Sequence, residues 1–342
     1  MYRVMTLLPS MDPGRGQVVR EPERPAPGYW AGSPGILYEA ASQRFLLSYR
    51  QRRPRGTGQD RGWRCALAAS SDGAHFDDIW EIRKDELNTA SMERFSLMAA
   101  PGGGYRLYIS YVDPADHRWR IDVLEAAEPG SFAIPSARPA LTAANTGTEG
   151  VKDPYTLRSG PVTHLFASFA AARPFTAEDR RRAHSTSDIY NTGMTTHPTG
   201  LATSLDGIGF QWHGPVLDVG DSWDAYQARL TCVVPIGTGY VGFYDGSAGA
   251  RENYEERCGI AASDDLWHWQ RLTTRRPWVV SPYGSGATRY IDALVMDGQW
   301  WIYYEMARAD GAHDLRLLRA PIADDARQAD GSAGAARAAS NR

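Results

Sequence analysis

The fold is decided by residues 145–171, which read NTGTEGVKDPYTLRSGPVTHLFASFAA. This stretch places a carboxylate, Asp153, at the start of a short apolar run. A tight turn at Ser159-Gly160-Pro161 follows, and a second apolar run extends from His164 to Phe169. Two β-rich runs joined by a glycine-containing turn predict a β-hairpin.

The same layout occurs five times along the chain. Each hairpin is followed by a third β-rich run and often by a fourth that is rich in aromatic residues. The polar anchors at the starts of the five units are separated by 60, 60, 71 and 65 residues, and they are Ser33, Glu93, Asp153, Asp224 and Arg289. Five units of about four strands each predict an all-β fold, a five-bladed β-propeller.

The fifth unit lacks an outer strand in the sequence. We expect the N-terminal segment, through Tyr2 to Leu8 or through Gln17 to Arg20, to supply this strand and close the ring. Closure removes the exposed sheet edge that a terminal blade would otherwise carry. The predicted organisation is therefore an N-terminal segment at 1–29, a propeller at 30–322 and a disordered Ala/Gly/Arg/Asp-rich tail at 323–342.

Composition narrows the classes of function. The chain has 342 residues, 11 Trp and 17 Tyr, and a net charge of −3 with both signs intermixed, so we expect neither nucleic acid nor a membrane as partner. The three cysteines (Cys65, Cys232 and Cys258) have no metal-type spacing and predict buried free thiols. A signal-peptide core and membrane-spanning segments are missing from the sequence pattern, which favours a cytoplasmic protein.

The lengths of the loops indicate which face of the predicted propeller carries the functional site. The connections between second and third strands are mostly long, and the longest covers residues 170–198. They lie at the end where the first strands start, and long loops on a rigid scaffold usually carry function.

Polar residues converge at that predicted face. Carboxylates close to one axis raise each other's pKa, which suits a general acid beside a general base. The candidate catalytic residues are Glu93, Asp153, Asp224, Asp292 and Glu305, and the candidate substrate-binding residues are Arg94, Lys152, Gln227, Arg229, Arg289, Tyr290, Asp245 and His313. Each carboxylate also has a structural interpretation, as a turn cap or as the partner of a nearby arginine. By contrast, the aspartates at the outer turns, Asp72, Asp206 and Asp264-Asp265, are interpreted as structural turn residues.

The stretch Val151-Lys152-Asp153-Pro154-Tyr155 resembles the Arg-Asp-Pro motif of the five-bladed propeller glycosidases, namely glycoside hydrolase families 43, 32, 68, 117 and 130. The resemblance covers about residues 30–320 as an architecture. It implies that Asp153 orients the substrate and tunes a neighbouring acid, or stabilises the transition state.

The first unit departs from that family pattern. Family 43 places its base, an aspartate, at the start of the first blade, where this chain has Ser33. Either the register is rotated by one blade or the chemistry differs. In a rotated register Glu93 is the nucleophile or base, Asp153 the orienting carboxylate and Asp224 the acid. Asp292 and Glu305 are then the alternative candidates for the acid.

Three functions follow from this pattern. The first is hydrolysis of a small glycoside or oligosaccharide by paired carboxylates. The second is phosphorolysis, with Arg94, Arg229 and Arg289 holding phosphate. The third is non-catalytic binding of a carbohydrate, which is favoured if the carboxylates are all tied in arginine pairs. We expect no cofactor. An axial calcium ion occurs in some members of the resembled families, but no ligand set is recognisable here.

Overall fold

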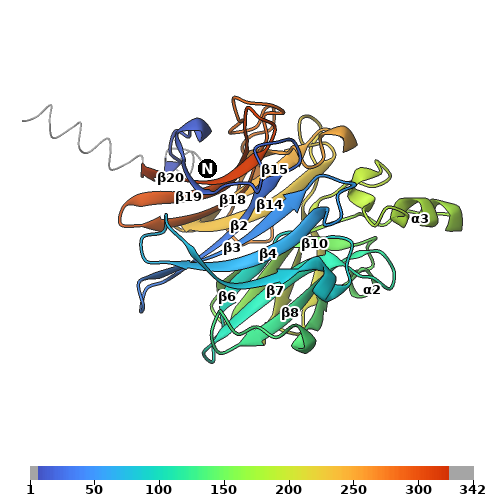
Figure 1. Ribbon diagram of the computed structural model, residues 1–342, viewed down its shortest axis with the longest axis horizontal. Helices are drawn as coiled ribbons and strands as arrows, with labels where there is room; N and C mark the ends of the chain where they lie inside the picture. The colour runs from blue at the N-terminus through green and yellow to red at the C-terminus, as the bar shows by residue number, and fades with distance from the viewer. Residues whose placement is uncertain (1–6, 323–342) are drawn as a thin grey trace, which may run out of the picture.

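The computed structural model describes residues 7–322 of the chain, and within them the protein is built from strands with a few short helices (Figure 1). The strands follow one another in antiparallel units, as the repeat predicted. The first unit contains β2 (Trp30–Glu39), β3 (Arg44–Arg53), β4 (Arg61–Ser70) and β5 (Asp77–Arg83). The second contains β6 (Ser96–Ala99), β7 (Tyr105–Val112), β8 (Trp119–Ala126) and β9 (Arg138–Leu141).

The remaining units continue this order. The third contains β10 (Val151–Ser159), β11 (Val162–Phe169), β12 (Thr199–Ser204) and β13 (Gln211–Leu217). The fourth contains β14 (Gln227–Ile236), β15 (Gly239–Ser247), β16 (Arg257–Ser263) and β17 (Gln270–Arg271). The fifth contains β18 (Thr288–Met296), β19 (Gln299–Ala307) and β20 (His313–Pro321). All five predicted hairpins are therefore present as the first two strands of a unit.

The N-terminal segment joins the last unit. Strand β1 (Gln17–Arg20) pairs antiparallel with β20, with Gln17 opposite Leu317, so it takes the outer position that the fifth unit lacked. This is one of the two predicted N-terminal segments. Most of the other, Tyr2 to Leu8, lies outside the described residues, as does the 323–342 tail that was predicted to be disordered.

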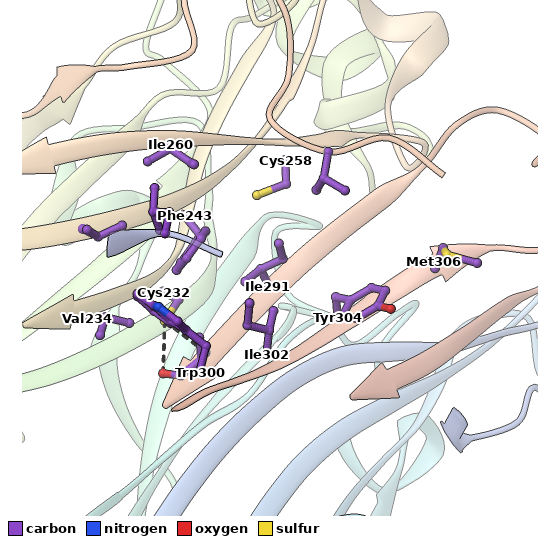
Figure 2. Close-up of a cluster of buried hydrophobic side chains, with 14 residues drawn as sticks. Cys232, Val234, Phe243, Cys258, Ile260, Ile291, Trp300, Ile302, Tyr304 and Met306 are labelled. Carbon is purple, nitrogen blue, oxygen red and sulfur yellow. Dashed lines mark hydrogen bonds between the residues drawn. The ribbon is translucent and has the colours of Figure 1, made fainter. Parts of the chain in front are cut away.

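The first strands lie next to one another. Each of β2, β6, β10, β14 and β18 contacts the next in this order, and β18 contacts β2. Apolar side chains fill the space between neighbouring units. Figure 2 shows side chains of β14–β16 meeting those of β18 and β19, and the indole nitrogen of Trp300 donates a hydrogen bond to the Leu7 carbonyl at 2.9 Å. The cysteines Cys232 and Cys258 belong to this core, and with Cys65 they are buried and free, as predicted.

Three first strands carry the same β-bulge. At Ser33, Asp153 and Tyr290 the backbone takes a positive φ of 48°, 57° and 51°, and the pairing register with the second strand shifts there. A bulge opposes two residues to one, which bends a strand and changes where a side chain is aimed. These three positions are therefore structurally equivalent, and the predicted anchor Arg289 lies one residue before its equivalent position.

Two other anchors are also out of register. The amide of Glu93 donates to the Ser110 carbonyl, which aligns Glu93 with Lys152 rather than with Asp153. Asp224 precedes the first residue of β14, and the residue of β14 that pairs with a second-strand carboxylate is Arg229. The spacing of polar residues thus located the units correctly but misaligned them by one to several residues.

The described helices are short. Helices α2 (Ala143–Thr146) and α3 (Ala177–His184) lie on the same side of the molecule in Figure 1. Within residues 7–322, no helix combines the length and the apolar character needed to cross a membrane.

Candidate active site at the axial cluster

Charged side chains meet where the first strands start and the second strands end. We call this group the axial cluster, and it consists of Arg50, Glu93, Lys152, Asp153, Arg229, Asp245, Glu256, Arg289, Tyr290 and Glu305. Every member is at most 1% exposed. Burial of this many charges is tolerated only when each has an opposite charge or a hydrogen-bond partner.

Glu93 and Asp153 lie together, as predicted for two residues of one site. The hydroxyl of Tyr290 is 3.2 Å from Glu93 Oε2 and 3.3 Å from Asp153 Oδ1, so the two carboxylates share one phenol group. Glu93 also forms an ion pair with Arg50 at the end of β3. The bulge at Tyr290 positions its side chain from the fifth unit between residues of the second and third units.

Asp153 is held by basic groups on several sides. Arg229 Nη1 is 2.7 Å from Asp153 Oδ2, and Lys152 Nζ is 3.7 Å from the same oxygen. The backbone amide of Arg94 donates to Asp153 Oδ1 at 3.2 Å. Burial raises the pKa of Asp153, but the charges of Arg229 and Lys152 outweigh it and hold this pKa below its ordinary value. Asp153 is therefore a carboxylate at neutral pH.

From Arg229 the charges alternate across the fourth and fifth units. Arg229 Nη2 is 2.7 Å from Asp245 Oδ2, and the two residues are cross-strand neighbours on β14 and β15. Arg289 and Glu305 are paired in the same way on β18 and β19, at 2.7 Å. Glu256 Oε2 is 2.6 Å from Arg289 Nη1 and 3.7 Å from Arg229 Nη2, so it connects the two pairs.

The carboxylates of this chain of charges differ in acidity. Burial raises the pKa of Glu256 and of Glu305, but the charge of Arg289, with Arg229 beside Glu256 and His313 beside Glu305, more than offsets it and lowers both below the ordinary value. Burial raises the pKa of Asp245 to about 6, against the attraction of Arg229 and with a further contribution from Glu256. A carboxyl group that titrates near neutral pH suits a general acid.

Burial also shifts the pKa of Lys152, the one lysine of the axial cluster. Burial lowers the pKa of Lys152 to about 8, despite the nearby Asp153 carboxylate. Its ammonium nitrogen lies 4.2 Å from the centre of the Tyr190 ring, a cation–π contact that partly replaces water.

The first strand of the first unit makes room for the cluster rather than supplying a charge. A Cβ atom at Gly32 would overlap the Glu305 carboxylate, so only glycine fits at this position. The amide of Ser33 donates to Glu305 Oε2 at 3.1 Å. Ser33, which stands where the resembled family 43 has an aspartate, therefore supports Glu305 through its backbone, while the cation of this unit, Arg50, comes from the second strand.

Residues 170–198 cover the cluster. Tyr190 contacts Lys152, and the ring of His197 stacks on Tyr190 at 4.1 Å. Asp188 is fully buried, accepts a hydrogen bond from the Tyr254 hydroxyl and pairs with Arg55 at 2.5 Å. The longest loop thus lies over the predicted working face and is tied to the loops of the first and fourth units.

Asp224 does not join the axial cluster. Its Oδ2 atom pairs with Arg271 on the outermost strand β17 at 2.8 Å and accepts from the Tyr244 hydroxyl at 3.1 Å. This corrects the expectation that Asp224 stands beside Glu93 and Asp153. Its location follows from the register, because β14 begins three residues later.

Arg94 and Asp292 lie one level further along the first strands. Arg94 Nη2 is 2.6 Å from Asp292 Oδ2, which also accepts from the Ile36 amide at 3.1 Å. Asp292 borders a cavity of about 270 Å³ that Tyr155 and Thr156 also line. Asp292 is thus paired with an arginine, as its structural interpretation expected, but the partner is Arg94 of the second unit rather than the neighbouring Arg289.

Gln227 and His313 border the cluster. Gln227 Nε2 donates to Glu256 Oε1 at 3.1 Å. His313 lies between Glu305, at 2.8 Å, and Glu255, at 3.1 Å, and its ring stacks on Trp30 at 4.3 Å. The structure therefore surrounds the predicted residues with groups that the sequence pattern did not single out, notably Glu256, Asp188, Tyr190 and Tyr254.

Within residues 7–322, no group of three or more His, Cys, Asp or Glu side chains is arranged to hold a metal ion.

Comparison with known proteins places the fold. No protein-family model matches the chain, and no curated protein matches its sequence. Solved structures do match. A glycosyl hydrolase from Bacteroides ovatus is 13% identical, with 92% of this chain and 97% of that chain covered and a TM-score of 0.59.

Two further structures extend this group. A GH43_1 enzyme from Xanthomonas citri is 13% identical, with 89% and 90% of the two chains covered and a TM-score of 0.57. The β-1,2-mannobiose phosphorylase from Listeria innocua, in complex with β-1,2-mannobiose, is 12% identical, with 94% and 96% covered and a TM-score of 0.58. The chain therefore has the all-β fold that propeller glycoside hydrolases of the family 43 type share with a related phosphorylase.

Proposed function

We propose that this protein is a glycoside-processing enzyme that hydrolyses a small glycoside or oligosaccharide at the axial cluster. One observation carries the proposal: Glu93 and Asp153 share the Tyr290 hydroxyl inside a fully buried charged cluster. The fold shared with glycoside hydrolases supports it. Glycosidic cleavage requires two carboxyl groups, one to protonate the leaving oxygen and one to act as base or nucleophile.

One of the three roles, that of the proton donor, differs from the role expected from the sequence. Glu93 acts as the base or nucleophile, and Asp153 remains ionised and orients the substrate. Asp245 replaces Asp224 as the proton donor, because it belongs to the cluster and its pKa of about 6 leaves part of it protonated near neutral pH. The donor gives its proton to the glycosidic oxygen as the bond to the anomeric carbon breaks. Water, activated by the base or attacking a glycosyl-enzyme intermediate, completes hydrolysis.

The five units act in this proposal as the blades of one closed propeller. The mutual contacts of the first strands, from β2 round to β18 and back, support a ring. The pairing of β1 with β20 supports closure by the N-terminal strand. A ring of first strands accounts for how residues of all five units come to share one small volume.

Phosphorolysis is a second candidate. Arg52 is 6% exposed and lies over the rings of Trp30 and Tyr254, at 4.5 Å and 4.2 Å. Burial lowers the pKa of Arg52 to about 10, and within the described residues no carboxylate forms an ion pair with it. A buried guanidinium with spare donors is suited to a phosphate oxygen.

Non-catalytic carbohydrate binding is the third candidate. It is favoured by the basic partners that Glu93, Asp153, Asp245, Glu256 and Glu305 all have within the cluster. A carboxylate committed to an arginine is less available for chemistry.

A screen of aryl glycosides, with and without inorganic phosphate, separates these functions. Hydrolysis predicts release of the phenol without phosphate and its loss in Glu93→Gln and Asp153→Asn. Turnover that depends on phosphate would assign phosphorolysis instead. Saccharide binding by calorimetry without any turnover would assign the non-catalytic function. The outer-turn variant Asp72→Asn is the matched control and should retain full activity.

A further inference from the structure

A second feature with the chemistry of a saccharide site lies away from the axial cluster. It is a cleft of about 440 Å³ between the outer strands of the third and fourth units. Its lining residues, which we call the Trp267 cleft, are His213, Pro215, Val216, Trp267, His268 and Trp269. None of them belongs to the axial cluster or contributes to the proposed chemistry.

The aromatic wall of this cleft is exposed and yet held in place. Trp267 is 38% exposed, and its ring meets the His213 ring edge to face at 4.7 Å. The amide of Trp267 donates to Asp265 Oδ1 at 2.8 Å, and His213 Nε2 is 2.7 Å from Thr203 Oγ1. An exposed ring that is already ordered loses little conformational entropy when a ligand stacks on it.

Hydrogen-bonding groups lie beside this ring. The His268 side chain is 90% exposed, and its Nδ1 is fixed at 2.7 Å from Asp265 Oδ2, so its Nε2 remains free for a ligand. The nitrogen of Trp269 is already bonded to the Leu266 carbonyl at 3.0 Å. The cleft therefore presents a flat apolar face with the free Nε2 of His268 at its edge.

The turn that carries Trp267 recurs in two other units, and there the aromatic residue is missing. The Oγ atoms of Ser70 and Ser204 accept from Gly73 and Gly207, as the Oγ of Ser263 accepts from Leu266. The next residue is Ala74 in the first unit and Ile208 in the third. The turn itself does not require a tryptophan, because the buried Ala74 occupies the same place.

The fourth unit also differs from the first and third units at the residue before Trp267. Gly73 and Gly207 have φ values of 72° and 68°, the left-handed region that favours glycine. Leu266 adopts 72° at the same place and packs into the core beside Phe166 and Leu230. The unit thus anchors this turn by a buried leucine directly before the exposed tryptophan.

We propose that the Trp267 cleft is a saccharide-binding surface site, separate from the axial cluster. The face of Trp267 stacks on the apolar face of a sugar ring, and His268 and His213 hydrogen-bond its hydroxyl groups. The choice of a saccharide as ligand rests on the proposed function. An extended saccharide bound there is held near an enzyme that acts on its ends or on its fragments.

Native gel electrophoresis of the full chain through gels containing arabinan, xylan, β-mannan or rhamnogalacturonan tests this site. At least one polysaccharide should retard the protein. Trp267→Ala should weaken the retardation roughly tenfold in dissociation constant, and His268→Ala should weaken it less. The matched variant His75→Ala, in the equivalent turn of the first unit, should behave like the wild type. Turnover of an aryl glycoside should be unchanged in Trp267→Ala.

Equal retardation of Trp267→Ala and the wild type would overturn the proposal, and so would a lack of retardation in all four gels. Loss of retardation in Glu93→Gln would also overturn it, because binding would then reside in the axial cluster. Absence of aryl-glycoside turnover alongside retardation that depends on Trp267 would instead contradict the proposed hydrolysis and leave this site standing.

Discussion

The carboxylates of the axial cluster and those of the outer turns look alike in the sequence and behave differently in the fold. Asp153 is 1% exposed, and an arginine and a lysine compensate its charge. The Asp72 side chain is 51% exposed, and its Oδ1 accepts the amides of Ala74 and His75 at 2.8 and 2.9 Å. The outer carboxylates organise a local turn in water, whereas the axial ones depend on residues from other units.

Because the axial carboxylates are buried and the outer-turn carboxylates are exposed, removing a charge should change the free energy of unfolding by different amounts in the two regions. A charge that has left water needs its partner, and removing one member of such a pair strands the other. A charge at an exposed turn keeps its hydration, so only local hydrogen bonds are lost when it is removed. The two regions should therefore respond to substitution with different magnitudes and different observables.

The largest expected effect is on catalysis at Glu93. Glu93→Gln removes the base or nucleophile while preserving shape, and kcat/KM for the best aryl glycoside should fall by about 10² to 10⁴-fold. Steady-state kinetics measures the loss, with Asp72→Asn alongside. Activity within a factor of two of the wild type would remove Glu93 from the site.

A large loss of stability is expected at Arg229. Arg229→Met leaves Asp153 and Asp245 without their shared cation and should lower the free energy of unfolding by about 3–5 kcal/mol. Urea titration followed by tryptophan fluorescence measures this. Adding Asp153→Asn to the variant should recover part of the loss, and a decrease below about 1 kcal/mol would contradict a buried network.

A smaller, pH-dependent effect is expected at Asp245. Its pKa in the folded protein is raised to about 6, so ionising it opposes folding. Its contribution to the free energy of unfolding is highest below pH 4, declines between about pH 4 and 6 and is level above. Asp245→Asn should therefore become more stable relative to the wild type when the pH rises from 4 to 7.

Parallel denaturation curves of the wild type and the Asp245→Asn variant at both pH values measure that difference. A relative stability that shifts the other way would mean that Arg229 overcomes the burial of Asp245. If Asp245 is the proton donor, kcat/KM of the wild type should also fall above about pH 6.

The smallest effect is expected at the outer turn. Asp72→Ala removes two backbone hydrogen bonds from an exposed turn and should lower the free energy of unfolding by about 1 kcal/mol without changing activity. The equivalent Asp265→Ala should have the same effect on stability. A loss from Asp72→Ala as large as that from Arg229→Met would erase the distinction between the two regions.

The hairpins, the five units and the outer turns could be predicted because they are local. A strand pair needs only two β-rich runs and a turn, and the turn at Asp72 needs only a carboxylate two and three residues before the amides it binds. The prediction for Asp224 was wrong because the place of this residue depends on strand pairing, which is not a local feature. It is a polar residue before an apolar run, as Asp153 is, and only the pairing of Arg229 with Asp245 reveals the true register.

The sequence by itself determined the all-β repeat, the end of the molecule at which polar residues gather, and the presence of Glu93 and Asp153 there. The tertiary structure alone decided which charges meet. The deciding contacts join different units or loops: Arg50 pairs with Glu93, Tyr290 lies between two carboxylates, and Asp188 pairs with Arg55. There are two physical reasons. A bulge shifts by one residue the position from which a side chain is aimed, and burial strengthens the interaction between two charges. Neither effect is visible in the local spacing of residues.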